Sequence, residues 1–281
     1  MNTAHQLQIF LYGKTGRNGG FLRRNGNNGF YIGGVIEDPE DLTLQTPKSF
    51  WQRFRIHMKV HHEVTAIHPD RKTVSVKNLI TQEVFEESYD KLLLSPGAKP
   101  LWPKLPGMES HKLFTLRTVE DTFRIRDFVD QNNPKSAVMV GGGFIGLEVA
   151  ENLRHLGLDV TIVQRPKQLM NPFDADMASF IHAEMRKHGV KLALGYSVEG
   201  FAECEVGIDV LLKDRAPIHA DMVVLAIGVT PESTLAKEAG LALGMKSSIL
   251  VNDRMETSAP DIYAVGDAVQ VKHYVTGHDA L

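Results

Sequence analysis

The segment VMVGGGFIGLEVAENL, residues 138–153, decides the fold of this chain. An apolar run stops at three consecutive glycines and is followed by an amphipathic stretch. Gly141, Gly143 and Gly146 give the spacing G-x-G-x-x-G between a predicted strand and a predicted helix, which is the context that a dinucleotide-binding turn requires. In such a turn the first glycine permits the tight bend and the second lets the backbone approach a pyrophosphate. The third lets the helix pack closely on the strand.

The helix predicted after this turn would direct unpaired N–H groups and its positive dipole end at an anion. Phe144, Ile145 and Glu148, at the start of that helix, therefore join the three glycines as candidate cofactor-binding residues. The alternative is an ordinary glycine-rich turn of an α/β domain. The complete strand–turn–helix–strand pattern favours dinucleotide binding over it.

The next predicted strand, DVTIVQR (residues 159–165), should end beside the adenine ribose. Sites for NAD usually carry Asp or Glu there, whereas an arginine accommodates the 2′-phosphate of NADP. This strand ends in Gln164 and Arg165, so no carboxylate repels a 2′-phosphate and Arg165 can pair with it. The pattern favours NADPH, or use of both dinucleotides. A solvated surface arginine is the alternative interpretation of Arg165.

Composition limits the class of protein. Hydrophobic residues make up 43% of the 281 residues and charged residues 23%, the profile of a globular protein. The formal net charge of −3 gives no sign of the excess of basic residues that nucleic-acid-binding proteins carry. No apolar run approaches the roughly 18 residues of a membrane helix, so neither nucleic acid nor membrane is an expected partner. The single cysteine, Cys204, forms no internal disulfide and suits a reducing cytoplasm.

The organisation of the chain changes after residue 29. Residues 1–29 are crowded with Gly, Asn and Arg without a helical or strand period, and we expect poor order there. Two alternating stretches follow, with Asp70-Arg71 between them as a hairpin turn, and a helix is predicted to start at Thr118 with acidic residues in its first turn. Further along, strands alternate with helices, which predicts an α/β fold with parallel sheets and helices on both faces.

Four motifs together carry a resemblance to a known family. They are YDKLLLSPGAKP (89–100), VGGGFIGLEVAENL (140–153), LAIGVTPES (225–233) and TSAPDIYAVGDAV (257–269). Their order and spacing resemble those of the FAD-dependent pyridine nucleotide-disulfide oxidoreductases, most of all the coenzyme A-disulfide reductases and the related NADH oxidases and persulfide reductases. The resemblance implies a Rossmann-like, three-layer, two-domain fold, with an inserted NAD(P) domain at residues 113–245. Residues 30–112 and 246–281 would form an incomplete FAD domain.

The resemblance also implies roles for particular residues. Ser95, Gly97 and Ala98 would lie against FAD, and Gly228 would border the nicotinamide. Asp267 would accept hydrogen bonds from the FAD ribitol, with Gly266 allowing close approach. A Gly-Asp pair after a buried strand agrees with this role, because α/β sheets bind ligands at the carboxyl ends of their strands. The alternative is that Asp267 caps a following helix.

The sequence departs from the family pattern in three places. Residues 1–29 contain no strand–GxGxxG–helix pattern for the FAD pyrophosphate. Gly26 occupies the position of the family's redox cysteine, counted back from Tyr31. The sequence ends soon after Asp267, so we expect it to lack the dimerisation domain through which the family forms homodimers. No catalytic residue is therefore assigned.

No metal site is expected. His57, His61 and His62 have no acidic or cysteine partner at a recognisable spacing. Glu203 and Glu205 flank Cys204 and should disfavour its thiolate, which needs positive neighbours. Cys204 is therefore interpreted as structural or incidental.

Three functional hypotheses follow. The first is FAD- and NAD(P)H-dependent reduction of a CoA disulfide or persulfide, a function of the family that we expect to be inactive in this chain because the thiol position holds glycine. The second is a non-catalytic NAD(P)-binding remnant. The third is a cysteine-independent, flavin-dependent NAD(P)H oxidase or reductase.

Overall fold

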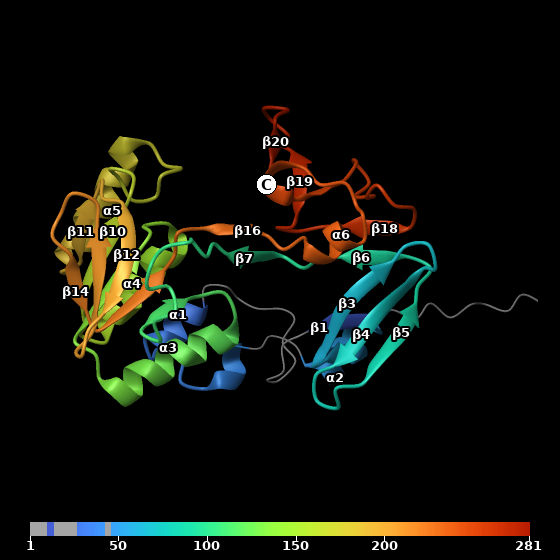
Figure 1. Ribbon diagram of the computed structural model, residues 1–281, viewed down its shortest axis with the longest axis horizontal. Helices are drawn as coiled ribbons and strands as arrows, with labels where there is room; N and C mark the ends of the chain where they lie inside the picture. The colour runs from blue at the N-terminus through green and yellow to red at the C-terminus, as the bar shows by residue number, and fades with distance from the viewer. Residues whose placement is uncertain (1–9, 14–26, 43–45) are drawn as a thin grey trace, which may run out of the picture. The chain divides into compact units, whose positions relative to one another are not determined.

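The computed structural model describes residues 10–13, 27–42 and 46–281, and the chain forms two compact units (Figure 1). The first unit comprises residues 1–23, 43–99 and 230–281, and the second comprises residues 24–42 and 100–229. Most of the predicted inserted domain, 113–245, lies in the second unit, but residues 230–245 fold with the first. By these bounds the chain changes unit four times. Two of the changes fall in β7 (Ala98–Pro100) and β16 (Val229–Pro231), and these two strands pair with each other.

A five-stranded parallel sheet forms the centre of the second unit, in the order β11–β10–β9–β15–β8. Its strands are β8 (Leu113–Thr115), β9 (Ser136–Val140), β10 (Asp159–Gln164), β11 (Lys191–Leu194) and β15 (Met222–Leu225). The central strand, β9, pairs in parallel with both β10 and β15. After Ser136 its residues are apolar and buried on both faces, as expected of an inner parallel strand.

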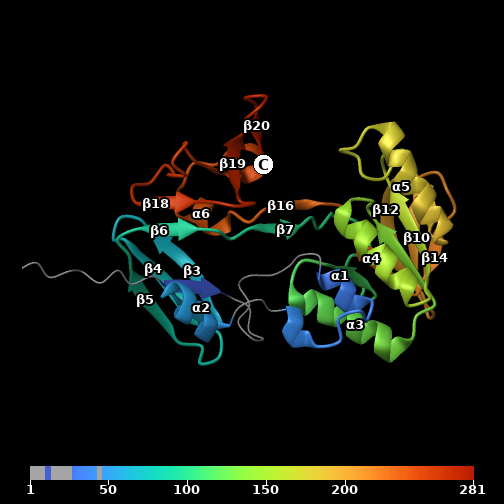
Figure 2. The ribbon, with the colours of Figure 1, turned by 180° about the vertical axis from the view of Figure 1, so that it is seen from behind.

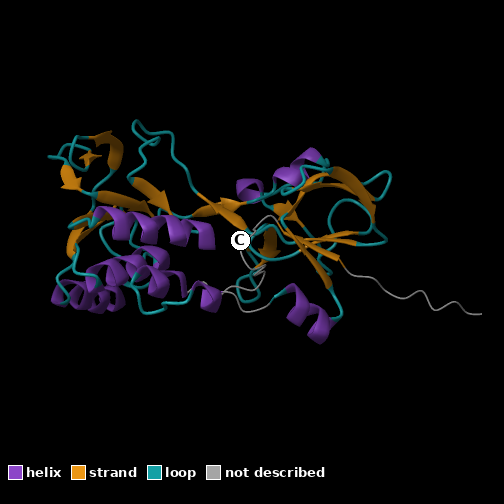
Figure 3. Ribbon diagram, turned by 90° about the horizontal axis from the view of Figure 1, so that it is seen from below, coloured by secondary structure: helices purple, strands orange, loops and turns teal. Residues whose placement is uncertain are grey.

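Alternate residues of β9 enter two different cores. Ala137 and Met139 belong to a core shared with helices α3 (Val119–Asn132), α4 (Phe144–His155) and α5 (Ala175–Lys187). Val138 and Val140 belong to a core shared with the antiparallel strands β12 (Val198–Glu203), β13 (Ile208–Leu212) and β14 (Ile218–Ala220). The second unit therefore has three layers, and its helices gather on one side of its strands (Figure 3).

This arrangement confirms the predicted three-layer α/β fold but corrects one detail. Helices on both faces of the parallel sheet were expected, and in the second unit an antiparallel β-sheet covers one face instead. Its alternating pattern explains why it can do so: Ile208, Val210 and Leu212 are buried, while the residues between them are half-exposed.

Helix α3 begins where the sequence predicts. The Thr118 hydroxyl accepts a hydrogen bond from the Asp121 amide at 3.1 Å, and the Asp121 carboxylate accepts one from the Thr118 amide at 2.8 Å. This reciprocal pair satisfies two of the amide donors at the helix start. The acidic first turn, Glu120 and Asp121, also suits the positive end of the helix dipole.

A short helix from the N-terminal part of the chain, α1 (Asn27–Ile32), belongs to the second unit and lies beside α3 (Figures 1 and 2). Ile32 is fully buried in the helical core, and its carbonyl accepts a hydrogen bond from Arg126 Nη1 at 3.0 Å. The Tyr31 and Phe123 rings meet edge to face at 5.4 Å between centroids. The 3₁₀ turn η1 (Pro39–Leu42) follows α1.

Small sheets make up the first unit. They are the parallel pair β1 (Phe10–Gly13) and β2 (His57–Val60), the antiparallel β3 (His62–His68), β4 (Thr73–Asn78) and β5 (Val84–Ser88), the parallel pair β6 (Leu92–Leu94) and β18 (Ile262–Ala264), and the set β17 (Ile249–Leu250), β19 (Val269–Lys272) and β20 (Asp279–Ala280). Helices α2 (Pro47–Phe54) and α6 (Thr234–Glu238) and the turn η2 (Met245–Ser247) complete it. One core joins β3 and β4 to α6 and the C-terminal strands.

Two local expectations can be compared with this unit. The predicted hairpin turn at Asp70-Arg71 is confirmed, because β3 and β4 pair around it and the Arg71 amide donates to the His68 carbonyl at 3.3 Å. The poor order expected for residues 1–29 falls mostly outside the described residues. Within that segment, however, residues 10–13 form a strand in parallel with β2, which the composition did not predict. No helix in the described part of the chain is long and apolar enough to cross a membrane.

Asp221 joins two chain segments of the second unit. Its Oδ2 accepts hydrogen bonds from the amides of Lys135 at 2.6 Å and Ser136 at 2.9 Å, and from the Ser136 hydroxyl at 3.1 Å. Burial raises the pKa of this carboxyl, but the amide and hydroxyl donors outweigh burial, so the pKa lies below its ordinary value. Asp221 therefore favours the folded state when it is ionised.

We predict that Asp221→Asn lowers the free energy of unfolding by about 1.5–3 kcal/mol, the usual range for hydrogen bonds to a charged group. Because the folded pKa is depressed, the difference between the variants is complete above the unfolded pKa of about 4 and shrinks as pH falls through the folded pKa. Urea unfolding at several pH values measures it. The matched control is Asp159→Asn, whose exposed ion pairs with Arg154 and Lys191 should contribute less than about 1 kcal/mol. Equal effects of the two substitutions would contradict the prediction.

Candidate dinucleotide site

The glycine turn lies between β9 and α4, as the sequence predicts. Gly141 has a φ of +112°, a backbone conformation that side chains rarely adopt. A Cβ on Gly141 would lie 2.3 Å from the Ala226 carbonyl oxygen, which follows β15. A Cβ on Gly146 would lie 2.0 Å from the Gly141 carbonyl oxygen. Strand, turn and helix therefore approach one another too closely for any side chain at either position.

Gly143 is different from these two glycines. A Cβ added to it would meet nothing within 4 Å, and its φ of −87° is open to any residue. It is the N-cap of α4, and as a glycine it gives that helix end no side-chain hydrogen bond. The space within 4 Å of a Gly143 Cβ is thus open, and the first amides of a helix have no partner within the helix. Such an end fits the pyrophosphate of a dinucleotide, which takes its hydrogen bonds from backbone N–H groups.

The exposed residues at this end are Phe144 and Ile145, whose side chains are 69% and 41% exposed. The Phe144 ring meets the Phe173 ring edge to face at 6.4 Å between centroids. Both rings belong to the second unit, and together they form an apolar border beside the open helix end.

Gln164 supports the turn from the neighbouring strand. Its Oε1 accepts a hydrogen bond from the Gly142 amide at 2.9 Å, and its Nε2 donates to the Gln168 carbonyl at 3.4 Å. The Gly142 carbonyl in turn accepts from the Met170 amide at 2.8 Å. The sequence placed Gln164 beside the ribose; in the structure its amide group holds the turn and the following loop together.

Arg165 is exposed, and within the described residues it forms no ion pair. It directly follows β10 at the carboxyl end of the parallel sheet, where α/β folds bind ligands. Lys167 is also exposed, two residues further along. Arg165 is therefore available to an anionic group.

Glu148 lies away from the open helix end. A Cβ on Gly29 of α1 would lie 2.8 Å from Glu148 Cγ and Oε1, so α1 packs directly on this side chain. Its Oε1 is buried without a hydrogen-bond partner among the described residues, and burial raises the pKa of the carboxyl. Glu148 thus contacts α1 rather than the space in front of α4.

Gly228 follows β15 at the same edge of the sheet as the glycine turn. Its φ is +115°, and its carbonyl accepts a hydrogen bond from the Leu101 amide at 3.0 Å. A Cβ there would be 3.5 Å from Leu101 Cδ1, so space is not what requires glycine. The backbone conformation is the constraint.

The remaining candidate residues gather in the first unit. Strands β6 and β18 are parallel, and the Val265 amide donates to the Leu94 carbonyl at 2.9 Å. The segment with Ser95, Gly97 and Ala98 and the segment with Gly266 and Asp267 therefore leave the same carboxyl edge. Asp267 is exposed, and the chain after it enters strand β19. The alternative role of Asp267 as a helix cap is thus wrong.

Cys204 follows β12 on the antiparallel sheet. Its thiol is partly buried and lies 3.6 Å from the Ala202 carbonyl oxygen. Burial raises the pKa of the thiol, and Asp209 raises it further. The flanking residue Glu203 is engaged elsewhere, by the Ser110 hydroxyl at 2.6 Å. The sequence predicted that Glu203 and Glu205 would disfavour the thiolate. In the structure the carboxylate that raises the pKa of the thiol is that of Asp209.

Comparisons with known proteins agree with this geometry. The family model described as "Pyridine nucleotide-disulphide oxidoreductase" matches residues 4–280. The chain belongs to this family.

Relatives within the family can be compared more closely. The chain is 38% identical over 245 residues to the coenzyme A disulfide reductase of Staphylococcus aureus, covering 87% of this chain and 54% of the relative. The crystal structure of reduced Bacillus anthracis CoADR-RHD is 43% identical with a TM-score of 0.92, over 98% of this chain and 48% of that one. The water-forming NADH oxidase of Lactobacillus brevis bound to NADH is 31% identical with a TM-score of 0.87, over 97% and 59%. The chain thus spans about half the length of the curated relatives it matches.

FAD and NAD(P)H are the cofactors of this pyridine nucleotide-disulphide oxidoreductase family. The glycine turn of the second unit fits the dinucleotide, because the first amides of α4 are backbone donors and the N-cap residue Gly143 has no side chain, with open space at its Cβ position. In the first unit the described residues supply one sheet edge with an exposed carboxylate, Asp267. That edge fits a ligand rich in hydroxyl groups.

We predict that Gly143→Val weakens NADH and NADPH binding at least tenfold while the fold stays intact, since the added side chain fills only the open space. Nicotinamide fluorescence titration measures affinity. Thermal unfolding measures stability, and the free energy of unfolding should fall by no more than about 1 kcal/mol, the cost of a poorer N-cap. Gly146→Ala is the contrasting variant: its Cβ would meet backbone, so it should destabilise the protein itself. Unchanged affinity in Gly143→Val would show that the phosphates bind elsewhere.

Proposed function

We propose that this chain binds NAD(P)H in its second unit and is a FAD- and NAD(P)H-dependent oxidoreductase of the coenzyme A-disulfide reductase type. The observation that carries the proposal is the uncapped N-terminus of α4 behind Gly143, held in place by two glycines that admit no side chain. The similarity to a coenzyme A disulfide reductase and to an NADH oxidase bound to NADH supports it.

The second unit would bind the dinucleotide through backbone groups. The first amides of α4 donate to the pyrophosphate, and the helix dipole adds favourable interaction with its negative charge. Gln164 keeps the turn rigid, so little conformational entropy is lost on binding. Gly228 would border the nicotinamide, where its lack of a side chain leaves the ring accessible.

Ser95, Gly97, Ala98, Gly266 and Asp267 would hold FAD at the β6–β18 edge of the first unit. The Asp267 carboxylate accepts hydrogen bonds from ribitol hydroxyls, and Gly266, with a φ of +81° and open space at its Cβ position, lets the ligand approach the backbone. When bound, FAD supplies a two-electron acceptor for the reduced nicotinamide.

Reduction of a coenzyme A disulfide or persulfide needs a further group. A thiolate must attack one sulfur, forming a mixed disulfide and releasing the other sulfur as a thiol. Gly26, which lies outside the described residues, stands at the position where the resemblance implies the thiol. Cys204 lies on the antiparallel sheet of the second unit, and its pKa is raised. The disulfide step is therefore not assigned to any residue of this chain.

That observation favours a second candidate, a cysteine-independent NAD(P)H oxidase or reductase that passes electrons from FAD to oxygen or to a partner. A non-catalytic dinucleotide-binding protein is the remaining possibility. Oxygen consumption with added FAD and NADPH identifies an oxidase, and anaerobic NADPH oxidation with an artificial electron acceptor distinguishes a reductase from a non-catalytic protein.

We predict that NADPH binds more tightly than NADH and that Arg165→Glu reverses the order. Pairing between the guanidinium and a 2′-phosphate should contribute about 1.5–3 kcal/mol, which is roughly a tenfold to hundredfold preference. Competition titrations with both dinucleotides measure it. Lys167→Glu, an exposed charge change in the same loop, is the matched control and should leave the order unchanged. A preference for NADPH that survives Arg165→Glu would contradict the role of Arg165.

We predict that, in the absence of oxygen, coenzyme A disulfide added to the protein with FAD and NADPH causes no NADPH oxidation beyond the reduction of the flavin. The physical reason is the lack of a thiolate at the assigned position, which substrate excess cannot replace. Absorbance of NADPH under anaerobic conditions follows the reaction. Turnover that persists in Cys204→Ser would show a thiol-independent route, and turnover lost in that variant would identify Cys204 as the nucleophile.

A further inference from the structure

Three side chains meet on the outer face of the antiparallel sheet of the second unit. Asp209 on β13 lies directly opposite His219 on β14 and opposite Ala202 on β12. Cys204 directly follows β12, and its sulfur lies close to the ligand atoms of Asp209 and His219. Ile208 and Val210 point the other way, into the core under the parallel sheet. Cys204, Asp209 and His219 therefore share the solvent side.

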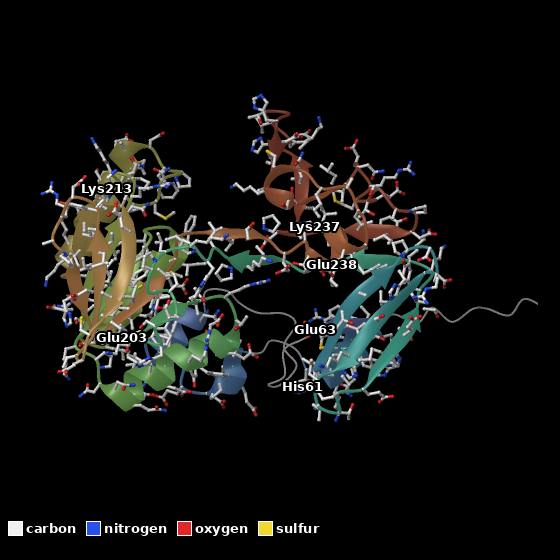
Figure 4. All side chains as sticks on the ribbon, viewed as in Figure 1. His61, Glu63, Glu203, Lys213, Lys237 and Glu238 are labelled. Atoms are coloured by element: carbon white, nitrogen blue, oxygen red, sulfur yellow. The ribbon has the colours of Figure 1, made fainter. Side chains whose placement is uncertain are left out.

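The three side chains are close enough to act together. One ligand atom of each lies within 4.8 Å of the other two. His219 Nδ1 and Asp209 Oδ1 are 2.8 Å apart. Cys204 and Asp209 are partly buried and His219 is exposed, so the cluster is anchored on its sheet side and open on the other. Figure 4 marks its neighbourhood, with Glu203 at the end of β12 and Lys213 beyond the opposite end of the sheet.

The backbone around the cluster is held in place. The Cys204 amide donates to the Gly207 carbonyl at 3.1 Å, closing the turn between β12 and β13. Lys112 Nζ donates to the carbonyls of Cys204 at 3.2 Å and Gly207 at 3.0 Å. Gly207 has a φ of +90°, and a Cβ there would lie 2.7 Å from His219 Nε2 and Cε1. The turn thus requires glycine both for its backbone and for the position of the imidazole.

A thiol, an imidazole and a carboxylate are the three ligand types of zinc sites. Around tetrahedral zinc, bonds of about 2.0–2.3 Å place ligand atoms about 3.3–3.8 Å apart, so small side-chain rotations close this cluster around an ion. Lys112 is the nearby positive charge, and its ammonium is engaged by two carbonyls and lies 3.7 Å from Glu203. A cation would also replace the thiol proton, as metal ions do at coordinating cysteines.

We propose that Cys204, Asp209 and His219 form a binding site for a thiophilic divalent cation, with Zn²⁺ as the expected ion. The three protein ligands leave a fourth position for water. Because Asp209 and His219 come from β13 and β14 and Cys204 directly follows β12, the ion would join three segments of the antiparallel sheet. Its binding to the folded state therefore stabilises the second unit by mass action.

Cobalt(II) is the probe, because it reports its ligands directly. The full chain is reduced, freed of metal with a chelator and titrated with Co²⁺. We expect one equivalent to bind with a thiolate-to-metal charge-transfer band and the intense visible bands of tetrahedral coordination. Zn²⁺ should then displace Co²⁺, raise the unfolding temperature and protect Cys204 from a thiol reagent.

Variants test each ligand. Cys204→Ser should abolish the charge-transfer band, and His219→Ala should lower affinity at least tenfold. His188→Ala is the matched control, since His188 also lies 2.9 Å from a carboxylate, that of Glu184, but has no thiol beside it. It should change nothing.

Two outcomes would overturn the proposal. One is Co²⁺ binding without the charge-transfer band in the unaltered chain, which would place the ion on other histidines. The other is free reactivity of Cys204 in the presence of excess Zn²⁺. Both measurements use the unaltered protein, so they remain decisive even if a variant fails to fold.

Discussion

The closeness of three backbone segments at the glycine turn is the constraint on which the second unit depends. The Ala226 carbonyl occupies the space of a Cβ on Gly141, and the Gly141 carbonyl occupies that of a Cβ on Gly146. Strand β9, helix α4 and the end of β15 can meet only because both positions are glycine. The same contact holds the start of α4 at the turn, where the space at the Gly143 Cβ position is open. A packing requirement of the fold and a binding surface for phosphate are therefore produced by one short segment.

Local features of this fold could be predicted from the sequence because the residues that determine them are close together in the chain. The glycine spacing, the Thr118 cap and the hairpin at residues 70–71 each depend on a few neighbouring residues. The antiparallel sheet over the parallel one could not be predicted in the same way. The alternation in β13 predicts a strand with one buried face, but not which surface that face covers. Helix α1 is similar: Ile32 is apolar, and only the folded chain shows that it enters the core beside α3.

The residue types of the dinucleotide site were predictable, while the partners of their side chains were not. Gln164 ends its strand as expected, yet its amide group bonds Gly142, a residue brought beside it by the pairing of β9 and β10. Asp267 follows a buried strand as expected, but the next element is another strand, which no local signal distinguished from a helix. Glu148 lies on the correct helix, and its contact with α1 depends on a segment more than a hundred residues earlier. In each case a register or a packing contact between distant segments decides the role.

Cys204 shows how such distant contacts also determine reactivity. Its neighbours in the sequence are two glutamates, and these suggested an inert thiol by simple repulsion. In the structure burial and Asp209 raise the pKa of the thiol, while Glu203 pairs with Ser110 and Lys112. A thiol that retains its proton is a poor nucleophile toward disulfides at neutral pH. The same carboxylate and a facing imidazole, however, are groups that bind a cation together with a thiolate. Asp209, which disfavours the thiolate and so redox chemistry at Cys204, is thus also one of the groups that suit this position to metal binding. The antiparallel sheet that holds it covers the face of the parallel sheet opposite to α4.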